Sequence, residues 1–335
     1  MKMLLTGGAG YVGSACLRYL IRQGHDPIAF DDLSEGNRDA VPADRLIVGD
    51  ILDQDALVQA MGDHKVEAVM HFAAVASVPE SIKDPDNYWK VNVIGTKNVL
   101  DAMRKTGVDR VVFSSTAATF GFHEEMPITE AFDQHPETPY GSTKLADEWM
   151  IREYAKAYDL GYAFLRYFNA SGADPDGEHG EDRREESHLI PLILYAALGR
   201  RDHVKIFGTE WDTRDGTCVR DYIHVEDLAQ AHMLCVENIG PGIGRDYCMG
   251  SGTGTTVLEV LRAAEELAGR DIPHELAPPR PGDPAVLIAS PDKITKELGW
   301  SPKYGDIKDI MRTAWAWHER YPDGYKSKSA AAQAG

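Results

Sequence analysis

The sequence predicts an α/β fold in which a doubly wound parallel sheet is joined to a smaller, mixed α/β unit. Short apolar runs alternate with amphipathic stretches throughout the first half of the chain, a pattern typical of parallel strands covered by helices on both faces. A glycine-rich turn separates the first apolar run from the first amphipathic stretch. After Asn169 the segments become shorter and richer in proline. A length of 335 residues is ample for two such units.

The strands of the parallel sheet are expected in short, mainly apolar runs, at residues 1–5, 26–31, 45–48, 66–72, 110–115 and 162–168. Helices are expected where apolar residues recur every three or four positions, at residues 11–23, 53–61, 91–106 and 142–158. Gly24 and Gly107 directly follow two of these stretches, as helix-ending glycines commonly do. The order of strands and helices therefore favours a sheet with crossover helices.

The second half of the chain has a different character. Residues 172–187 are rich in Gly, Asp, Glu and Arg and are expected to form a loop. We expect a first domain at residues 1–170 and a second at 171–330, with a soft boundary. A segment near 216–240 is expected to return to the first domain, because residues 225–237 read as a regular helix. The polar, alanine-rich residues 326–335 are expected to form a flexible tail.

Composition excludes several classes of partner. The formal net charge of −18 disfavours nucleic acid and anionic membrane surfaces. The longest apolar run, residues 189–198, falls short of the ~18 residues that a membrane-spanning helix requires. No metal-binding pattern is evident, since the cysteines are unpaired in spacing. We expect a cytoplasmic protein with reduced thiols at all of its cysteines, Cys16, Cys218, Cys235 and Cys248.

A dinucleotide site is predicted at the first glycine-rich turn. Gly7, Gly10 and Gly13 lie between a strand and a helix, where small residues let the backbone approach a pyrophosphate at the positive end of the helix. Asp31 ends the second strand, at the distance along the chain expected of the carboxylate that binds the adenosine ribose. Asp32 adds a second negative charge that would repel a 2′-phosphate. The pattern favours NAD over NADP and a Rossmann-type sheet.

A catalytic site is predicted at the head of the helix expected near residue 142. Tyr140 and Lys144 are four residues apart and lie on one helix face. A nearby ammonium favours the phenolate, so that the tyrosine can act as a general base or acid. Thr116 follows a strand end, where ligands bind in a doubly wound sheet. Its hydroxyl can bind the same substrate oxygen as the tyrosine.

These residues resemble the short-chain dehydrogenase/reductase superfamily of the extended type, and within it the UDP-glucose 4-epimerases. The resemblance covers nearly the whole chain, in order, and includes TGGAGYVGS (6–14), PYGSTK (139–144), LRYFNASGADPDG (165–177) and DGTCVRDYIHVEDLA (215–229). It implies an isomerase that binds NAD in the first domain and a UDP-sugar between the domains. In such enzymes the tyrosine takes the proton of the sugar 4-hydroxyl while NAD takes the hydride, and the 4-keto sugar rotates before it is reduced on its other face.

The resemblance also implies contacts, position by position. Besides the three glycines, Tyr140 and Lys144, the residues expected to contact NAD are Tyr11, Val12, Asp31, Asp32, Asp50, Ile51, Phe72, Ala73, Ala74, Asn92 and Phe168. Besides Thr116 and Tyr140, those expected to contact the UDP-sugar are Asn169, His188, Leu189, Phe207, Arg220, Tyr222, Arg280, Asp283 and Leu287. The two arginines suit a diphosphate, whose oxygens they can bind in pairs. A homodimer through residues 91–106 and 142–158 is implied as well.

Three alternatives stay open at this point. The same chemistry serves 4-epimerases that act on UDP-N-acetylglucosamine or on UDP-xylose and UDP-arabinose. Leu287 stands where relatives carry a bulky aromatic residue that restricts N-acetylated sugars. A 4,6-dehydratase is disfavoured because Ala117 and Ala118 stand where it needs an acid/base pair. A catalytically silent NAD-binding regulator is disfavoured because the tyrosine and the lysine are both present. The chain departs from its relatives at Ala76, Pro79 and Phe120.

Overall fold

The computed structural model describes residues 1–280 and 283–326, and its largest feature is a seven-stranded sheet in the order β11-β6-β5-β4-β1-β2-β3. Every neighbouring pair of strands in this sheet is parallel. The strands are short and mostly apolar, as a sheet buried on both faces requires. They are β1 (Lys2–Thr6), β2 (Asp26–Asp31), β3 (Leu46–Val48), β4 (Ala68–His71), β5 (Arg110–Thr116), β6 (Gly161–Tyr167) and β11 (Gly244–Met249).

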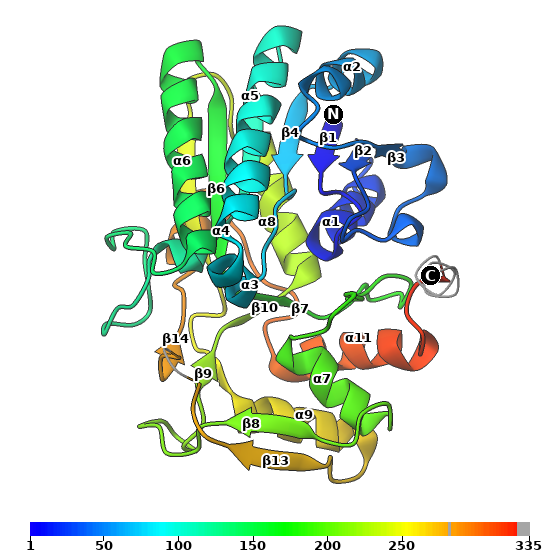
Figure 1. Ribbon diagram of the computed structural model, residues 1–335, viewed down its shortest axis with the longest axis vertical. Helices are drawn as coiled ribbons and strands as arrows, with labels where there is room; N and C mark the ends of the chain where they lie inside the picture. The colour runs from blue at the N-terminus through cyan, green and yellow to red at the C-terminus, as the bar shows by residue number, and fades with distance from the viewer. Residues whose placement is uncertain (281–282, 327–335) are drawn as a thin grey trace.

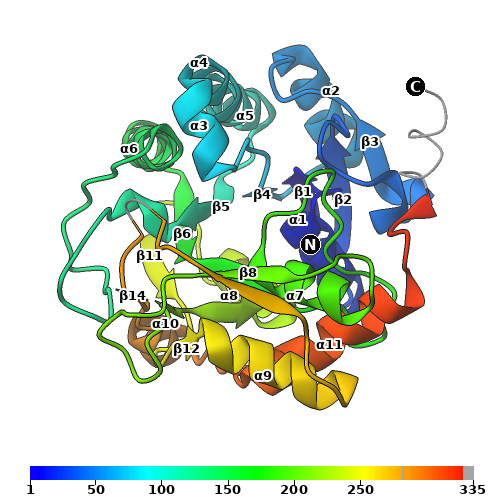
Figure 2. The ribbon, with the colours of Figure 1, turned by 60° about the horizontal axis from the view of Figure 1, so that its bottom comes forward.

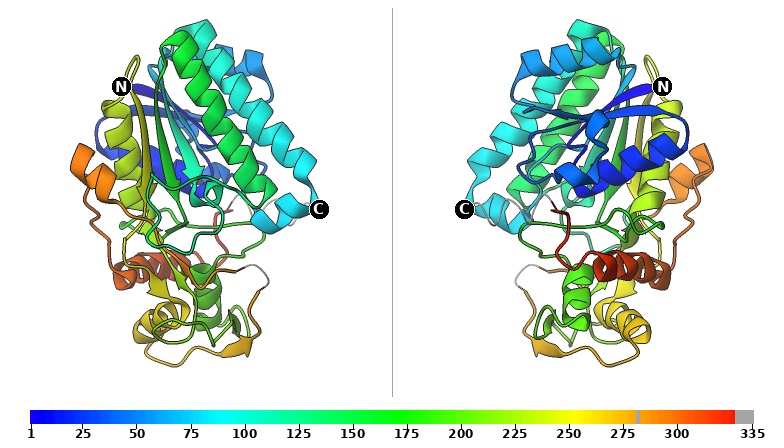
Figure 3. Two further views of the ribbon diagram at one scale, coloured as in Figure 1. Left: turned by 90° about the vertical axis from the view of Figure 1, so that its left-hand side faces the viewer. Right: turned by 90° about the vertical axis from the view of Figure 1, so that its right-hand side faces the viewer.

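Helices cover both faces of this sheet (Figures 1 and 3). On one face α1 (Tyr11–Arg22) packs along α8 (Val225–Glu237). On the other face α5 (Gly95–Thr106) lies between α2 (Gln54–His64) and α6 (Pro139–Tyr158). Two apolar clusters fill the layers between sheet and helices, one on each side. The predicted doubly wound α/β fold is therefore confirmed.

The order of the strands reverses between β1 and β4. After β1 the chain continues to β2 and β3 on one side of the sheet, whereas after β4 it continues to β5 and β6 on the other side. In open α/β sheets, ligands bind beside the carboxyl ends of the strands at such a reversal. The turn after β1 lies there, because the backbone N–H of Phe72 and of Ala73 both donate to the Thr6 carbonyl.

A smaller unit of mixed structure lies below the carboxyl edge of the sheet (Figures 1 and 2). Its core is an apolar cluster among α7 (Leu189–Ala197), α9 (Val257–Ala268) and α11 (Ile307–Arg320). Three small sheets complete the lower part, and their pairs are β7 with β10, β8 with β13, and β9 with both β12 and β14. Their strands are β7 (Asn169–Ser171), β8 (Val204–Phe207), β9 (Val219–Arg220), β10 (Tyr222–His224), β12 (Thr255–Thr256), β13 (His274–Ala277) and β14 (Val286–Leu287).

The structure also differs from the sequence-based expectation in detail. The helix expected at residues 91–106 begins earlier, as a π-helix at Trp89–Ile94 that continues into α5. The short helices α3 (Val78–Lys83), α4 (Pro85–Tyr88) and α10 (Asp292–Leu298) were not expected, and neither were α7, α9 and α11 of the smaller unit. Strand β11 was not expected either, although it pairs with β6 along its whole length. Residues 244–249 therefore belong to the large sheet.

Two sequence-based expectations concern the ends of the domains. The division into residues 1–170 and 171–330 stays a prediction, with α8 and β11 as the segments that return to the large sheet. Of the tail expected at residues 326–335, residues 327–335 lie outside the described part of the chain. Within the described residues, none of the helices combines the length and the apolar character that crossing a bilayer requires.

Candidate active site

The glycine turn after β1 is packed so closely that it excludes side chains. Gly7 has a φ of +68°, and a Cβ on it would lie 2.5 Å from the backbone nitrogen of Ala73. A Cβ on Gly13 would collide with the carbonyl oxygen of Gly7. Gly10 caps α1 without a side-chain hydrogen bond, and no acidic residue stands in the first turn. The backbone at the positive end of α1 is thus open to an anionic ligand, as a pyrophosphate requires.

Asp31 stands at the carboxyl end of β2, beside this turn. It is 7% exposed, and its carboxylate accepts hydrogen bonds from the backbone N–H of Ala9 at 2.9 Å and of Leu33 at 2.8 Å. Burial raises the pKa of Asp31, and these N–H groups oppose that rise. Asp32 is exposed and accepts hydrogen bonds from Ser34. Both carboxylates thus lie close to the glycine turn, and their contact with the ribose of a dinucleotide stays a prediction.

The other residues expected at the cofactor divide into two groups. Phe72, Ala73 and Ala74 follow β4 and are partly exposed, with Phe72 tilted against the ring of His232 at 4.8 Å. Val12 is also partly exposed, and Asp50 is exposed. Their exposure leaves these side chains accessible to a ligand, and their contact with NAD stays a prediction.

In the second group the side chains are held by the protein itself. Asn92 is fully buried, and its side-chain amide bonds to the backbone of Val75 and to Thr143. Tyr11 donates its hydroxyl to the Gly172 carbonyl at 2.7 Å. Ile51 and Phe168 pack in apolar clusters. Contacts within the protein hold these four side chains in place, and their direct contact with NAD stays a prediction.

Tyr140 and Thr116 meet at the carboxyl edge of the sheet. Thr116 ends β5, and Tyr140 lies in the first turn of α6, which Thr138 caps through the backbone N–H of Gly141. Burial raises the pKa of Tyr140 to about 12, while a hydrogen bond with Thr116 opposes that rise. The sequence predicted that a neighbouring ammonium would favour the phenolate. In the chain alone burial is stronger, so the phenol keeps its proton.

Lys144 lies one turn further along α6 and is 3% exposed. Its ammonium sits 4.1 Å from the centre of the Phe113 ring. Burial lowers the pKa of Lys144 to about 8, and the nearby carboxylates of Asp147 and Glu148 oppose that shift. With a pKa of about 8, Lys144 can gain or lose its proton near neutral pH. Its charge therefore depends on the acidic residues around it.

Side chains expected to hold the UDP-sugar come together from distant parts of the second half. Arg220 on β9 lies opposite Leu287 on β14 and forms an ion pair with Asp283 at 3.4 Å. The guanidinium of Arg280 stacks over the Phe207 ring at 4.1 Å. A cavity of about 500 Å³ adjoins this stack, lined by Gly208, Thr209, Glu210, Trp211, Leu276, Ala277, Pro278 and Pro279.

Asn169 and Tyr222 are neighbours on the paired strands β7 and β10. The side-chain amide of Asn169 donates to the Asp221 carbonyl at 2.8 Å, and Tyr222 is buried. This pair joins the end of β6 to the chain that leads into α8. Whether either side chain touches a substrate stays a prediction.

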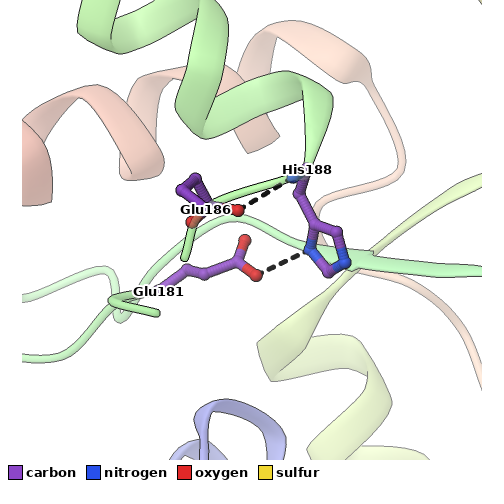
Figure 4. Close-up of side chains that lie close together, drawn as sticks. All are labelled: Glu181, Glu186 and His188. Carbon is purple, nitrogen blue, oxygen red and sulfur yellow. Dashed lines mark hydrogen bonds and ion pairs between the residues drawn. The ribbon is translucent and has the colours of Figure 1, made fainter. Parts of the chain in front are cut away.

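His188 and Leu189 stand at the start of α7, next to two glutamates (Figure 4). The His188 ring bonds through Nδ1 to Glu181 at 2.7 Å, while Glu186 accepts the backbone N–H of His188 at 2.8 Å. Although burial acts in the opposite direction on each group, the pair lowers the pKa of Glu181 to about 2 and raises that of His188. The cluster thus forms an ion pair that fixes the end of the loop at residues 172–187.

The chain is similar to known proteins over most of its length. The model of the NAD dependent epimerase/dehydratase family matches residues 3–250. The chain belongs to this family. It is 46% identical over 330 residues to the UDP-glucose 4-epimerase of Halalkalibacterium halodurans, covering 98% of this chain and 99% of that protein.

Solved structures of the NAD dependent epimerase/dehydratase type match almost the whole chain. A UDP-glucose 4-epimerase from Brucella ovis in complex with NAD is 45% identical, with a TM-score of 0.90, and covers 94% of this chain and 97% of its own. One from Bifidobacterium longum in complex with NAD+ and UDP is 34% identical, with a TM-score of 0.91, and covers 97% and 100%. The fold and the family therefore agree with the resemblance seen in the sequence.

Sequence reasoning missed three charged residues of this epimerase/dehydratase site. Arg183, in the loop at residues 172–187, lowers the pKa of Tyr140 by its positive charge. Nothing in the sequence indicates that the charge of a loop arginine acts on Tyr140. Asp147 and Glu148 lie three and four residues after Lys144, a spacing that places them on its side of the helix and that could have been noticed.

Proposed function

We propose that the chain is an NAD-dependent UDP-glucose 4-epimerase, which interconverts UDP-glucose and UDP-galactose. One observation carries the proposal. Tyr140, Lys144 and Thr116 meet at the sheet edge that also holds the glycine turn and Asp31, so an acid/base group stands beside a dinucleotide site. The names of the family and of the relatives described above support the same reaction.

Each catalytic side chain then has a distinct role. Bound NAD supplies the hydride acceptor and donor, and the glycine turn with Asp31 would hold it. Tyr140 takes the proton from the sugar 4-hydroxyl and returns it. Since burial holds the pKa of this phenol at about 12, a positive charge close to it is needed to make it a base. Thr116 orients the same sugar oxygen through its hydroxyl.

The UDP portion is assigned to Arg220, Arg280 and Phe207. Two guanidinium groups supply the charge that a diphosphate requires on an otherwise acidic protein. The Phe207 ring offers a flat apolar face to the uracil, in place of or beside the Arg280 guanidinium that now stacks on it at 4.1 Å. Firm binding at this end lets the sugar end stay loose enough to turn over between the two hydride transfers.

We also propose a homodimer through α6 and the π-helix. Large apolar side chains are exposed to solvent there, with Trp149 61%, Ile94 49% and Trp89 45% exposed. The two helices pack side by side, so the three residues can form one patch. Light scattering with size-exclusion chromatography should give twice the 37.0 kDa chain mass, and Trp149→Glu should reduce it. A monomeric parent protein would contradict this assembly.

A cytoplasmic location remains part of the proposal. It is supported by the four cysteines, all of which are free and buried. Such thiols are typical of a reducing compartment.

The function is tested by product analysis. Purified protein is incubated in separate tubes with UDP-glucose, UDP-N-acetylglucosamine and UDP-xylose, and the epimers are separated by chromatography. UDP-galactose as the main product, together with NAD released from the denatured protein, is the expected result. Turnover of UDP-xylose alone, or no epimer from any of the three, would overturn the assignment.

A further inference from the structure

Helix α6 carries a buried carboxylate to which the proposed reaction gives no role. Asp147 is 1% exposed and follows Lys144 by three residues, on the same side of the helix. By geometry neither of its oxygens has a hydrogen-bond partner among the described residues, although the nearby Thr96 hydroxyl helps to lower its pKa. A buried carboxylate without hydrogen bonds is costly, by several kcal/mol if it is charged and uncompensated. Burial accordingly raises the pKa of Asp147, and the positive charge of Lys144 is the strongest of the effects that oppose this rise. Asp147 therefore needs that charge to be retained as an anion.

Lys144 is a buried cation that in turn needs a negative charge nearby. Its ammonium lies against the Phe113 ring, and the carboxylates that act on it are those of Asp147 and Glu148. Glu148, however, is already committed to another cation. The Arg166 guanidinium donates to both of its oxygens, at 2.8 and 2.7 Å, and Ser115 donates at 2.6 Å. Of the two carboxylates, Asp147 is the one left to balance the lysine.

The remaining titratable groups around this pair do not change the balance. From β4, His71 faces Lys144, but burial lowers the pKa of His71 to about 3 and keeps the ring neutral. From β6, Arg166 is neutralised by Glu148. Tyr140 lies on the same helix, and the negative charge of Asp147 raises its pKa. Asp147 thus acts on both members of the tyrosine–lysine pair, and in the same direction.

We propose that Asp147 is a positioning residue that acts as the buried counterion of Lys144, and that it sets the pH range in which the tyrosine–lysine pair works. The inference rests on the proposed epimerase function. A negative charge at this position favours the protonated form of the lysine and of the tyrosine alike. Removing that charge should therefore move both limbs of the pH profile to lower pH, without changing which residues touch the substrate.

The test compares pH profiles of kcat and KM for the parent protein, Asp147→Asn and Glu153→Gln. Asparagine keeps the shape of the side chain and removes its charge. Glu153 is an exposed acid on the same helix and serves as the matched control. We expect the Asp147→Asn profile to move to lower pH by about one unit, the size of shift that a close opposite charge produces. The control profile should not move, and KM should stay within two-fold for both variants.

The outcomes separate the inference from the proposed function. If the parent protein shows no epimerase activity at any pH, the proposed function fails. If the parent is active and the Asp147→Asn profile has the same pH dependence, with or without a lower maximal kcat, Asp147 is not the counterion. Asp147→Ser offers a second neutral variant should asparagine fold poorly, and it must show the same displacement. Asp147→Glu, which restores the charge, should return the profile towards that of the parent.

Discussion

The ion pair between Glu148 and Arg166 gives the sharpest prediction about stability. Glu148 is fully buried on α6, and Arg166 on β6 is 1% exposed, so the pair ties a helix to the sheet away from water. Glu148→Gln keeps the volume but removes the charge. The carboxylate accepts four hydrogen bonds, one from Ser115, two from Arg166 and a longer one from Gln134 at 3.4 Å. The single carbonyl oxygen of glutamine cannot replace both contacts with the guanidinium.

The expected cost follows from those contacts. Each hydrogen bond to a charged partner contributes about 1.5–3 kcal/mol, and breaking one side of a buried pair costs about 3–5 kcal/mol. Because Arg166 keeps a second partner in Asp246 at 3.2 Å, the loss should fall at the lower end, at about 3 kcal/mol. Equilibrium unfolding in urea, followed by tryptophan fluorescence, measures it.

A paired variant controls for the loss of packing. Replacing both residues, as Glu148→Leu with Arg166→Met, removes the charges together and should be less destabilising than Glu148→Gln alone. The exposed Glu153→Gln should be neutral. A cost below about 1 kcal/mol for Glu148→Gln, the level of a surface pair, would refute the reasoning that this buried pair joins α6 to the sheet.

Two further predictions concern ligands. Asp31→Ala should weaken NAD binding by about 1.5–3 kcal/mol, through lost charge-assisted hydrogen bonds to the ribose; calorimetric titration of the protein freed of nucleotide measures this, and an unchanged affinity would remove Asp31 from the site. Leu287→Tyr should abolish weak turnover of UDP-N-acetylglucosamine and spare UDP-glucose, because the larger ring fills the space of an acetamido group; parallel loss of both activities would show that Leu287 does not gate the sugar.

The sequence predicted the large sheet well because its strands are short apolar runs between helices of clear period. The sequence pattern does not predict strand β11, because its sequence, GRDYCM, begins with a glycine and two charged residues. It lies at the edge of the sheet, where one neighbour suffices, and Arg245 pairs with Glu297 of α10 instead of facing the core. Only the tertiary pairing with β6 makes this segment a strand.

The start of the helix expected at residues 91–106 was also not predicted. The run at residues 91–106 has a helical period, but its first turns form a π-helix in which Asn92 bonds to Val75 and Thr143. That irregular turn depends on partners far away along the chain. Local propensity carries no information about them.

The candidate site was predicted where residues follow strand ends or share a helix face, as Asp31, Thr116, Tyr140 and Lys144 do. Its electrostatics were not predicted. Burial, which the sequence does not report, raises the pKa of Tyr140 and lowers that of Lys144. The loop that carries Arg183 and Glu181 has no periodic pattern, so its return to the site became visible only in the structure.

The central claim is that Tyr140 moves the proton of the sugar 4-hydroxyl, and Tyr140→Phe tests it most directly. The variant keeps the ring and removes the ionisable oxygen. Conversion of UDP-glucose to UDP-galactose, followed by proton NMR, should slow by about 10²–10⁴-fold, while calorimetry should show UDP binding unchanged. Epimerisation within a few-fold of the parent rate, with UDP still bound, would contradict the account.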